Sequence, residues 1–332
     1  MFDNIISSVY NRLSFSKSYK QKDKVMAEMN EDGPGYAGIS VSAEALNAVL
    51  TTAKGEVLRS VNVRMESSEG ISAQISDFIN ALKDDLGPLE SIGVAVPGLI
   101  SKETGRVEFS ARIPEHSQIN LKAELESDTG LAILIENDAN AAAFAEFIAG
   151  AGRGASDLFY LTLGGGVGGG LILNGKIWHG AYGFAGEVGY LLVNEEGMRL
   201  EEMASSPNIV RRTQNRFRQD STSELSKLEE DQITIAAILD AAEKDDDLAK
   251  LMLERTGNYV GAAVAGVINL LNIEKVVIGG DIMQVGDHVL AAAIARAKEL
   301  SFAPSFDRTS ITAGELGGNA AAIGAAFLAG GL

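Results

Sequence analysis

Six glycines within seven positions are the feature of this chain that most constrains its fold. The stretch "LTLGGGVGGGLILNG", residues 161–175, places them between two apolar runs. A backbone without side chains either turns tightly or lets another group come very close. The flanking runs predict the two strands of a hairpin that the glycines divide, and the pair Asn174-Gly175 predicts the next turn. A bare turn can also hold an anion, because its N–H groups are accessible.

Composition narrows the class of protein. The chain has 332 residues and 46% of them are apolar, which suits about two globular domains with real cores. It has no cysteine, which excludes disulfides and thiolate metal sites, and its histidines (His116, His179 and His288) lie too far apart in sequence for a metal-ligand motif. The net charge of −17 argues against partners such as nucleic acid or an anionic membrane. No run is long enough to span a membrane and the N-terminus lacks secretory-signal features, so a cytoplasmic protein is expected.

The apolar pattern predicts the same series of elements twice. After a leader, residues 1–35, the first series has a long strand or hairpin arm over 36–52, followed by elements over 57–65, 70–83, 91–98, 120–130, 131–136 and 137–151. The second has the glycine hairpin over 158–176, helices near 200–218, 234–244 and 247–271, then elements over 275–281, 286–300, 309–314 and a last helix ending near Ala329. This repeat predicts an α/β fold of two similar lobes, residues 36–133 with 318–332 and residues 134–317, facing each other across a ligand cleft.

Several motifs in this order resemble the ROK family of bacterial sugar kinases and sugar-responsive repressors. They are "IGVAVPGLI", "LIENDANAAAFAEFIAGAGRGASD", "YLTLGGGVGGGLILNGKIWHGAYGFAGEVG" and "LEEMASSPNIVRR". The stretches "KVVIGGDI" and "ELGGNAAAIGAAFLA" resemble that family's nucleotide-site strand and closing helix. The resemblance runs from about Tyr36 to the C-terminus. It implies the two-lobed actin/hexokinase-like ATPase fold and a homodimer.

The resemblance also assigns candidate sugar-site residues. Asp138 matches the family's catalytic base, and its place at the start of a helix beyond a buried strand suits that role. The alternative is that Asn137 or Asp138 only caps the helix. Asn137 and Gly98 match sugar contacts, while Glu187 and Glu201 match carboxylates that grip sugar hydroxyls. One carboxylate can accept from two neighbouring hydroxyls, although both glutamates could instead be surface or capping acids.

The glycine run matches the family's second phosphate loop. The resemblance therefore gives these candidate cofactor-binding residues: Gly164, Gly165, Gly166, Gly168, Gly279 and Gly280. Bound ATP and Mg²⁺ are expected only if the chain is a kinase. The alternative for the run is a tight hairpin that needs unusual backbone dihedral angles.

The first phosphate motif of the family's kinases, Asp-x-Gly-Gly-Thr-Lys, is replaced by "SVSAEA". Ser40 stands where the aspartate would help to hold Mg²⁺, and Glu44 stands where a threonine would meet phosphate. Two like charges about 4 Å apart repel by roughly 4 kcal/mol at an effective dielectric constant near 20. This hairpin is therefore predicted to disfavour ATP.

The sugar side differs from the family as well. Arg112 in "RIP" replaces an asparagine, and Tyr190 replaces the histidine after Gly189; both are kept as candidate sugar-binding residues. The family's cysteine zinc loop is missing, so no zinc is expected. Arg112 either balances the nearby candidate carboxylates in an ion pair or binds the anion of an acidic or phosphorylated sugar.

Three functions follow. The first is a sugar-binding protein with weak or no kinase activity, a sensor that acts through a protein partner and has no DNA-reading domain of its own, since residues 1–35 show no helix-turn-helix pattern. The second is an ATP-dependent hexose kinase with Asp138 as the base. The third is a structural scaffold that binds no small molecule. The retained sugar residues favour the first two, and "SVSAEA" separates them.

Overall fold

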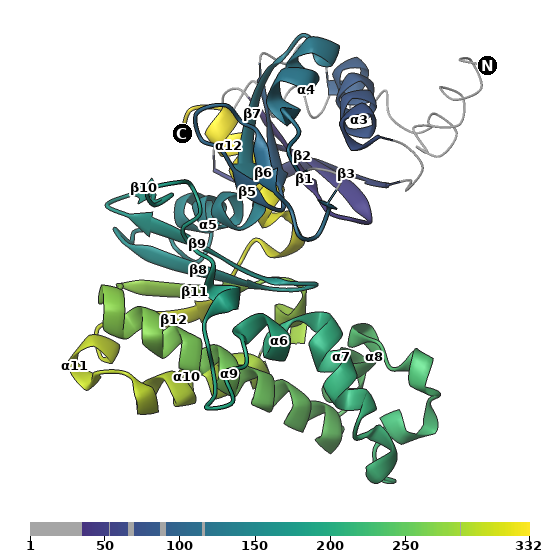
Figure 1. Ribbon diagram of the computed structural model, residues 1–332, viewed down its shortest axis with the longest axis vertical. Coiled ribbons are helices and arrows are strands. Elements are labelled where there is room, and N and C mark those ends of the chain that lie inside the picture. The colour runs from purple at the N-terminus through teal and green to yellow at the C-terminus, as the bar shows by residue number, and fades with distance from the viewer. Residues whose placement is uncertain (1–34, 53, 66–69, 87–90, 115–116, 286) are drawn as a thin grey trace. The chain divides into compact units, whose positions relative to one another are not determined.

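A computed structural model describes residues 35–332 of the chain, apart from 53, 66–69, 87–90, 115–116 and 286. The predicted leader thus lies almost wholly outside the described residues. The chain divides into two compact units, one ending at Asp138 and including Ala321–Leu332, the other Ala139–Ala320 (Figure 1). The lobes predicted from the sequence divide the chain a few residues earlier at both points. In the part of the chain that the structure describes, no helix could cross a bilayer.

The first unit is built on a five-stranded sheet in the order β3-β2-β1-β4-β7. Its strands are β1 (Tyr36–Val41), β2 (Ala45–Thr51), β3 (Val57–Arg64), β4 (Ser91–Val96) and β7 (Ala132–Asn137). β1, β4 and β7 run parallel, whereas β2 and β3 are antiparallel additions. The long strand or hairpin arm predicted over residues 36–52 is wrong as a single element, because the chain turns at residues 42–44 and forms the hairpin of β1 and β2.

Two helices and a small hairpin complete the first unit's core. They are α3 (Ile71–Leu86), α4 (Leu121–Thr129), β5 (Leu99–Ile100) and β6 (Val107–Phe109). The helix α3 packs by an apolar face, since Ile75, Phe78 and Ile79 are buried. The helix α4 ends where predicted, because Gly130 takes the left-handed conformation and its N–H closes on Glu126.

The second unit repeats the sheet topology, in the order β10-β9-β8-β11-β12. Its strands are β8 (Leu158–Leu163), β9 (Val167–Leu173), β10 (Lys176–Ile177), β11 (Lys275–Gly279) and β12 (Ser310–Ala313). β8, β11 and β12 are parallel, and β9 and β10 are antiparallel. The glycine-divided hairpin is confirmed. The predicted turn after it is confirmed as well, and its residues Asn174 and Gly175 both have positive φ. The duplicated α/β unit predicted from the sequence is therefore present.

The helices of the second unit follow the predicted positions with one correction. They are α5 (Asp138–Ala149), α6 (Leu200–Ala204), α7 (Ser206–Gln214), α8 (Ile235–Glu243), α9 (Asp247–Leu271), α10 (Asp287–Leu300) and α11 (Ala303–Phe306). The single helix predicted near 200–218 is wrong, because it is broken at Ser205. That residue is extended, and Pro207 lies in the first turn of α7, where its missing N–H costs nothing.

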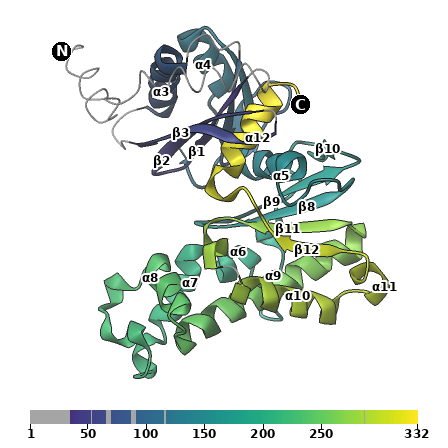
Figure 2. The same cartoon turned by 180° about the vertical axis from the view of Figure 1, so that it is seen from behind.

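Two alanine-rich helices pack on glycines of the sheets. α5 follows β7 in sequence but packs on β9, where a Cβ on Gly170 would lie 2.7 Å from Ala143 Cβ. α12 (Ala320–Ala329) follows β12 but packs on the first sheet, where a Cβ on Gly38 would lie 2.0 Å from the carbonyl oxygen of Ala322. Figures 1 and 2 show each helix lying along that sheet. Glycine in the strand and alanine on the helix are thus required together, because any side chain on the strand would separate them.

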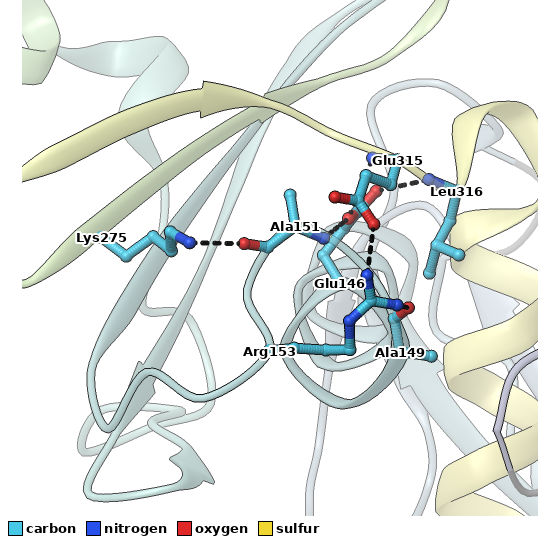
Figure 3. Close-up of polar contacts among 7 residues, drawn as sticks. All are labelled: Glu146, Ala149, Ala151, Arg153, Lys275, Glu315 and Leu316. Atoms are coloured by element: carbon cyan, nitrogen blue, oxygen red, sulfur yellow. Dashed lines mark hydrogen bonds and ion pairs between the residues drawn. The ribbon is translucent and has the colours of Figure 1, made fainter.

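A buried carboxyl group fixes the C-terminal end of α5. Glu146 is only 1% exposed. It accepts the backbone N–H groups of Ala151 at 2.8 Å, Glu315 at 3.1 Å and Leu316 at 2.9 Å (Figure 3). The carboxyl group lies so close to Gly150 and Gly314 that a Cβ at either would fall within 2.0 or 2.7 Å of its oxygens.

Charged side chains reinforce this junction at its surface. Arg153 donates to the carbonyl oxygen of Ala149 and pairs with Glu315 at 2.9 Å, and Lys275 donates to the carbonyl oxygen of Ala151 at 2.7 Å. The pair between Arg153 and Glu315 is exposed on both sides, so it contributes little by itself. The buried bonds to Glu146 therefore carry most of the connection between α5 and the loop that follows β12.

We expect Glu146→Gln to destabilise the second unit by about 1–3 kcal/mol, because the new amide turns a donor toward an N–H group that has lost its acceptor. Chemical denaturation followed by circular dichroism measures this loss. Glu299→Gln, which changes an exposed partner of Arg296, is the matched control and should shift stability by less than about 0.5 kcal/mol. Equal stability of both variants would contradict this role of Glu146.

Candidate functional site

The predicted site residues gather mainly where parallel strands end. In each unit three parallel strands end at the same edge of their sheet, and in open α/β sheets ligands bind outside that edge. In the first unit the loops after β1, β4 and β7 hold Glu44, Gly98 and Asp138. In the second unit the segments after β8, β11 and β12 are residues 164–166, 280–281 and 314–318. One edge therefore carries amide and carboxylate side chains, and the other is rich in glycine.

The turn after β1 is closed by the hydroxyl of Ser42. That hydroxyl accepts the N–H groups of Glu44 at 3.3 Å and Ala45 at 3.0 Å, and it donates to the carbonyl oxygen of Ala45 at 3.0 Å. Two N–H groups of the turn are thus already engaged. The side chain of Glu44 is exposed beside them. The sequence placed Ser42 in a glycine position but gave no sign that its hydroxyl would take the amides.

The loop after β4 brings two predicted sugar-site residues together. The Asn137 side-chain amide donates to the carbonyl oxygen of Gly98 at 3.0 Å. Gly98 has φ of +135°, and a Cβ there would lie 2.5 Å from the carbonyl oxygen of Phe109, so only glycine fits. The Ser110 hydroxyl donates to the carbonyl oxygen of Pro97 at 2.8 Å and fixes the loop further. Gly98 and Asn137 are thus held in one arrangement by hydrogen bonds within the first unit.

Asp138 is the first residue of α5 and directly follows Asn137. Its carboxylate therefore lies at a helix N-terminus, where the macrodipole favours negative charge. Arg112, also in the first unit, is exposed and pairs with no described residue of that unit. Its expected ion pair with the candidate carboxylates as a group, which include Glu187 and Glu201 of the second unit, stays a prediction.

The glycine turn after β8 is tied to the helices α6 and α7. The N–H of Gly164 donates to the carbonyl oxygen of Gly166 at 3.0 Å, and the Gly164 carbonyl accepts from Ser206 at 2.7 Å. The N–H of Val167 donates to the carboxylate of Glu201 at 3.0 Å. Glu201 is thus brought to the turn itself, where one of its oxygens is already engaged.

The second half of the glycine run has a packing role. Gly168 and Gly170 face α5, where a Cβ on Gly168 would lie 3.2 Å from Ala139 Cβ. Gly169 faces the opposite way, and a Cβ there would lie 2.7 Å from the carbonyl oxygen of Gly186. Close approach of a helix on one side and a loop on the other accounts for these glycines. A cofactor contact by Gly168 stays a prediction.

The segment after Gly186 places the remaining sugar-site candidates around β9. Glu187 is exposed and precedes the short helix η2 (Val188–Tyr190). Gly189 packs so closely that a Cβ would lie 2.5 Å from the carbonyl oxygen of Val167 and 3.5 Å from Glu201 Cβ. Tyr190 is 57% exposed, and its ring stacks under the Arg199 guanidinium, whose Cζ lies 4.5 Å from the ring centroid. Its face is thus engaged by Arg199, and its contact with sugar stays a prediction.

The loop that stands where the family has zinc ligands is closed by hydrogen bonds. Val193 donates to the carbonyl oxygen of Met198 at 2.9 Å, and the Met198 N–H donates to the Asn194 side chain at 2.9 Å. Gly197 closes the turn with φ of +77°. Within the described part of the chain, no group of three or more His, Cys, Asp or Glu side chains could hold a metal ion.

The turn after β11 contributes a residue that sequence reasoning missed. Gly280 has φ of +95°, and a Cβ there would lie 2.2 Å from the carbonyl oxygen of Leu163. The next residue, Asp281, is exposed and points toward the glycine turn, with its Oδ2 3.7 Å from where a Gly164 Cβ would be. The only sequence signal was a carboxylate directly after the pair Gly279-Gly280.

The sequence matches the ROK family over residues 36–331. It is 31% identical over 312 residues to a glucokinase from Halalkalibacterium halodurans, covering 88% of this chain and 94% of the relative. It is 28% identical over 327 residues to a xylose repressor from Caldicellulosiruptor bescii, covering 93% and 82%. A ROK family glucokinase from Streptomyces griseus, solved with glucose and AMPPNP, matches with a TM-score of 0.80 and 26% identity, covering 90% of this chain and 100% of that one.

The comparisons agree with both the sequence motifs and the duplicated sheets. The structural match to the Streptomyces griseus enzyme confirms the predicted actin-like ATPase fold. The family match includes every strand that the structure describes and all predicted site residues. The chain therefore belongs to the ROK family.

Proposed function

We propose that this chain is a sugar-binding sensor of the ROK family with weak or no kinase activity. The observation that carries the proposal is the turn after β1, where the Ser42 hydroxyl takes the N–H groups of Glu44 and Ala45. A phosphate at that turn would have to displace this hydroxyl and lie beside the Glu44 carboxylate. Ser40 offers no carboxylate to Mg²⁺. The residues present at this turn therefore do not fit ATP with its metal ion.

The sugar side supports binding. Asn137 and Gly98 are held together, and Asp138 begins the helix beside them. In the second unit Glu201 and the segment that carries Glu187 pack around the start of β9. Amides and carboxylates of this kind suit hydroxyl groups, because each offers several donor or acceptor positions. Related proteins of this family include a glucokinase and a xylose repressor, and sugar is the ligand class common to both names.

An ATP-dependent hexose kinase is the second candidate. The retained Asp138 favours it, as does the match to a glucokinase over 94% of that relative's length. In that case the Asp138 carboxylate would accept the proton of the attacking sugar hydroxyl. The two candidates differ at the turn after β1 and share the sugar contacts, so an activity measurement separates them.

We expect hexose phosphorylation to stay near background, because the turn after β1 does not accommodate phosphate. A coupled assay with ATP, Mg²⁺ and glucose, N-acetylglucosamine or xylose measures it. Any residual activity should vanish in Asp138→Asn, whose amide cannot take the hydroxyl proton. A turnover of about 1 s⁻¹ or more, which is ordinary for an enzyme, would restore the kinase function.

Sugar binding itself is tested by thermal shift. A sugar that binds only the folded protein stabilises it by RT ln(1 + [L]/Kd), so millimolar concentrations reveal weak sites. We expect at least one neutral or phosphorylated sugar to raise the melting temperature, and Asn137→Ala to reduce that shift. If no sugar shifts the transition, the chain is a scaffold without a small-molecule ligand.

We expect the purified protein to contain no structural zinc. The chain has no cysteine, and hydrogen bonds of Asn194 and Met198 already close the loop concerned. Elemental analysis by mass spectrometry after gel filtration measures the metal content. Zinc at one equivalent per chain, retained after dialysis without chelator, would refute this expectation.

Arg112 suggests a test of the ligand's charge. Because this guanidinium is exposed and unpaired among the described residues, it is available to an anion on the sugar. We expect Arg112→Ala to weaken binding of a sugar 6-phosphate by roughly tenfold to a hundredfold and to leave neutral sugars unchanged. Lys122→Ala, which removes another exposed cation of the first unit, is the matched control. Equal affinity of the wild-type protein for a hexose and its 6-phosphate would exclude an anionic ligand.

A further inference from the structure

The glycine turn after β8 has the form of an anion site. Of its N–H groups, Gly164 bonds within the turn and Val167 bonds to Glu201. Among the residues described by the structure, nothing accepts the N–H groups of Gly165 and Gly166. Successive free N–H groups on a turn without side chains attract anions. These two N–H groups are therefore open to an anionic ligand.

Two carboxylates lie beside this turn. Asp281 Oδ2 lies 3.7 Å from the position that a Cβ on Gly164 would take. The Glu201 carboxylate accepts the N–H of Val167, which directly follows the turn, at 3.0 Å. Within the described chain, neither carboxylate is paired with a cation. Negative charge therefore flanks the N–H groups that would hold an anion.

The backbone fixes Asp281 in this place. The preceding residue, Gly280, packs against Leu163 at the end of β8 in a conformation that favours glycine. The N–H of Met283 then donates to the Gly280 carbonyl oxygen at 3.1 Å and starts the short helix η6 (Asp281–Val285). Because the backbone is locked on both sides, Asp281 cannot leave the turn by a loop movement alone. Only a change of side-chain rotamer would move its charge.

We propose that Asp281 is a specificity-determining residue whose carboxylate disfavours phosphate groups at the turn formed by Gly164, Gly165 and Gly166. The repulsion acts on charge and not on shape, so a neutral ligand at the same turn is not penalised. The inference rests on the proposed sugar-binding function and extends it to the glycine-rich edge of the second unit. Nucleotides would then be disfavoured both at the turn after β1 in the first unit and at the glycine turn after β8 in the second.

The test compares the wild-type protein with Asp281→Asn, which keeps the side-chain size and removes the charge. Isothermal titration without Mg²⁺ measures the affinities for ADP, ATP and adenosine. We expect Asp281→Asn to bind ADP and ATP about tenfold more tightly at low salt and to bind adenosine as the wild type does. The gain should shrink at about 0.5 M salt, because screening weakens an exposed repulsion.

Asp307→Asn is the matched control. It removes the same charge from an exposed residue of the second unit. Asp307 lies before the start of β12, whereas Asp281 follows the end of the parallel strand β11. Equal nucleotide affinities of the two variants would overturn the proposal, and so would an equal gain for adenosine. In a second titration with Mg²⁺ present, weaker binding of Mg-ATP by Asp281→Asn would overturn it as well, since it would make Asp281 a metal ligand.

The same samples separate this inference from the proposed function. Thermal shift with sugar should be unchanged in both variants, which also shows that they are folded. If the wild-type protein phosphorylates hexose rapidly, the proposed function fails whatever Asp281 does. If the wild type is inactive and Asp281→Asn gains no nucleotide affinity, the proposed function stands and only the role of Asp281 fails.

Discussion

The buried carboxyl group of Glu146 holds together the two ends of the second unit. α5 begins where the chain enters that unit, after Asp138, and residues 314–318 precede the point where it leaves, after Ala320. Glu146 bonds to the backbone of Glu315 and Leu316 and so fixes these segments to each other. The helix that carries Asp138 at its start and the glycine-rich loop after β12 are therefore parts of one hydrogen-bonded assembly.

Local patterns predicted the elements of this fold, because hairpins, caps and apolar periodicity are written in neighbouring residues. The glycine-divided hairpin, the Gly130 cap and the long helix α9 needed nothing from elsewhere in the chain. The packing of α5 on β9 and of α12 on the first sheet could not be predicted this way. It depends on glycines meeting alanines that are distant in sequence, and a short alanine-rich helix gives no sign of which sheet it will cover.

Sequence reasoning proposed only those site residues that lie within the family motifs. The resemblance proposes Asn137 and Glu201 as sugar contacts, which stay predictions; the structure joins Asn137 to Gly98 and Glu201 to the glycine turn. The resemblance also presented the whole glycine run as one loop, whereas Gly168 and Gly170 serve the packing of α5. The hydroxyl of Ser42 and the carboxylate of Asp281 were missed, because a side chain's choice of partner depends on the turn that the backbone makes.

The turn after β1 differs from a phosphate loop that has merely decayed. Loss of the motif residues alone would leave N–H groups of this exposed turn open to water or to an anion. Here the Ser42 hydroxyl accepts two of them and donates in return to Ala45, so the hairpin is complete without a ligand. At the other edge the N–H groups of Gly165 and Gly166 have no acceptor among the described residues, and the carboxylate of Asp281 lies near the turn. Its charge, rather than a side chain that fills the turn, would disfavour an anion there. In our proposal the two edges disfavour phosphate by different physical means, while the amide and carboxylate groups suited to sugar hydroxyls are retained.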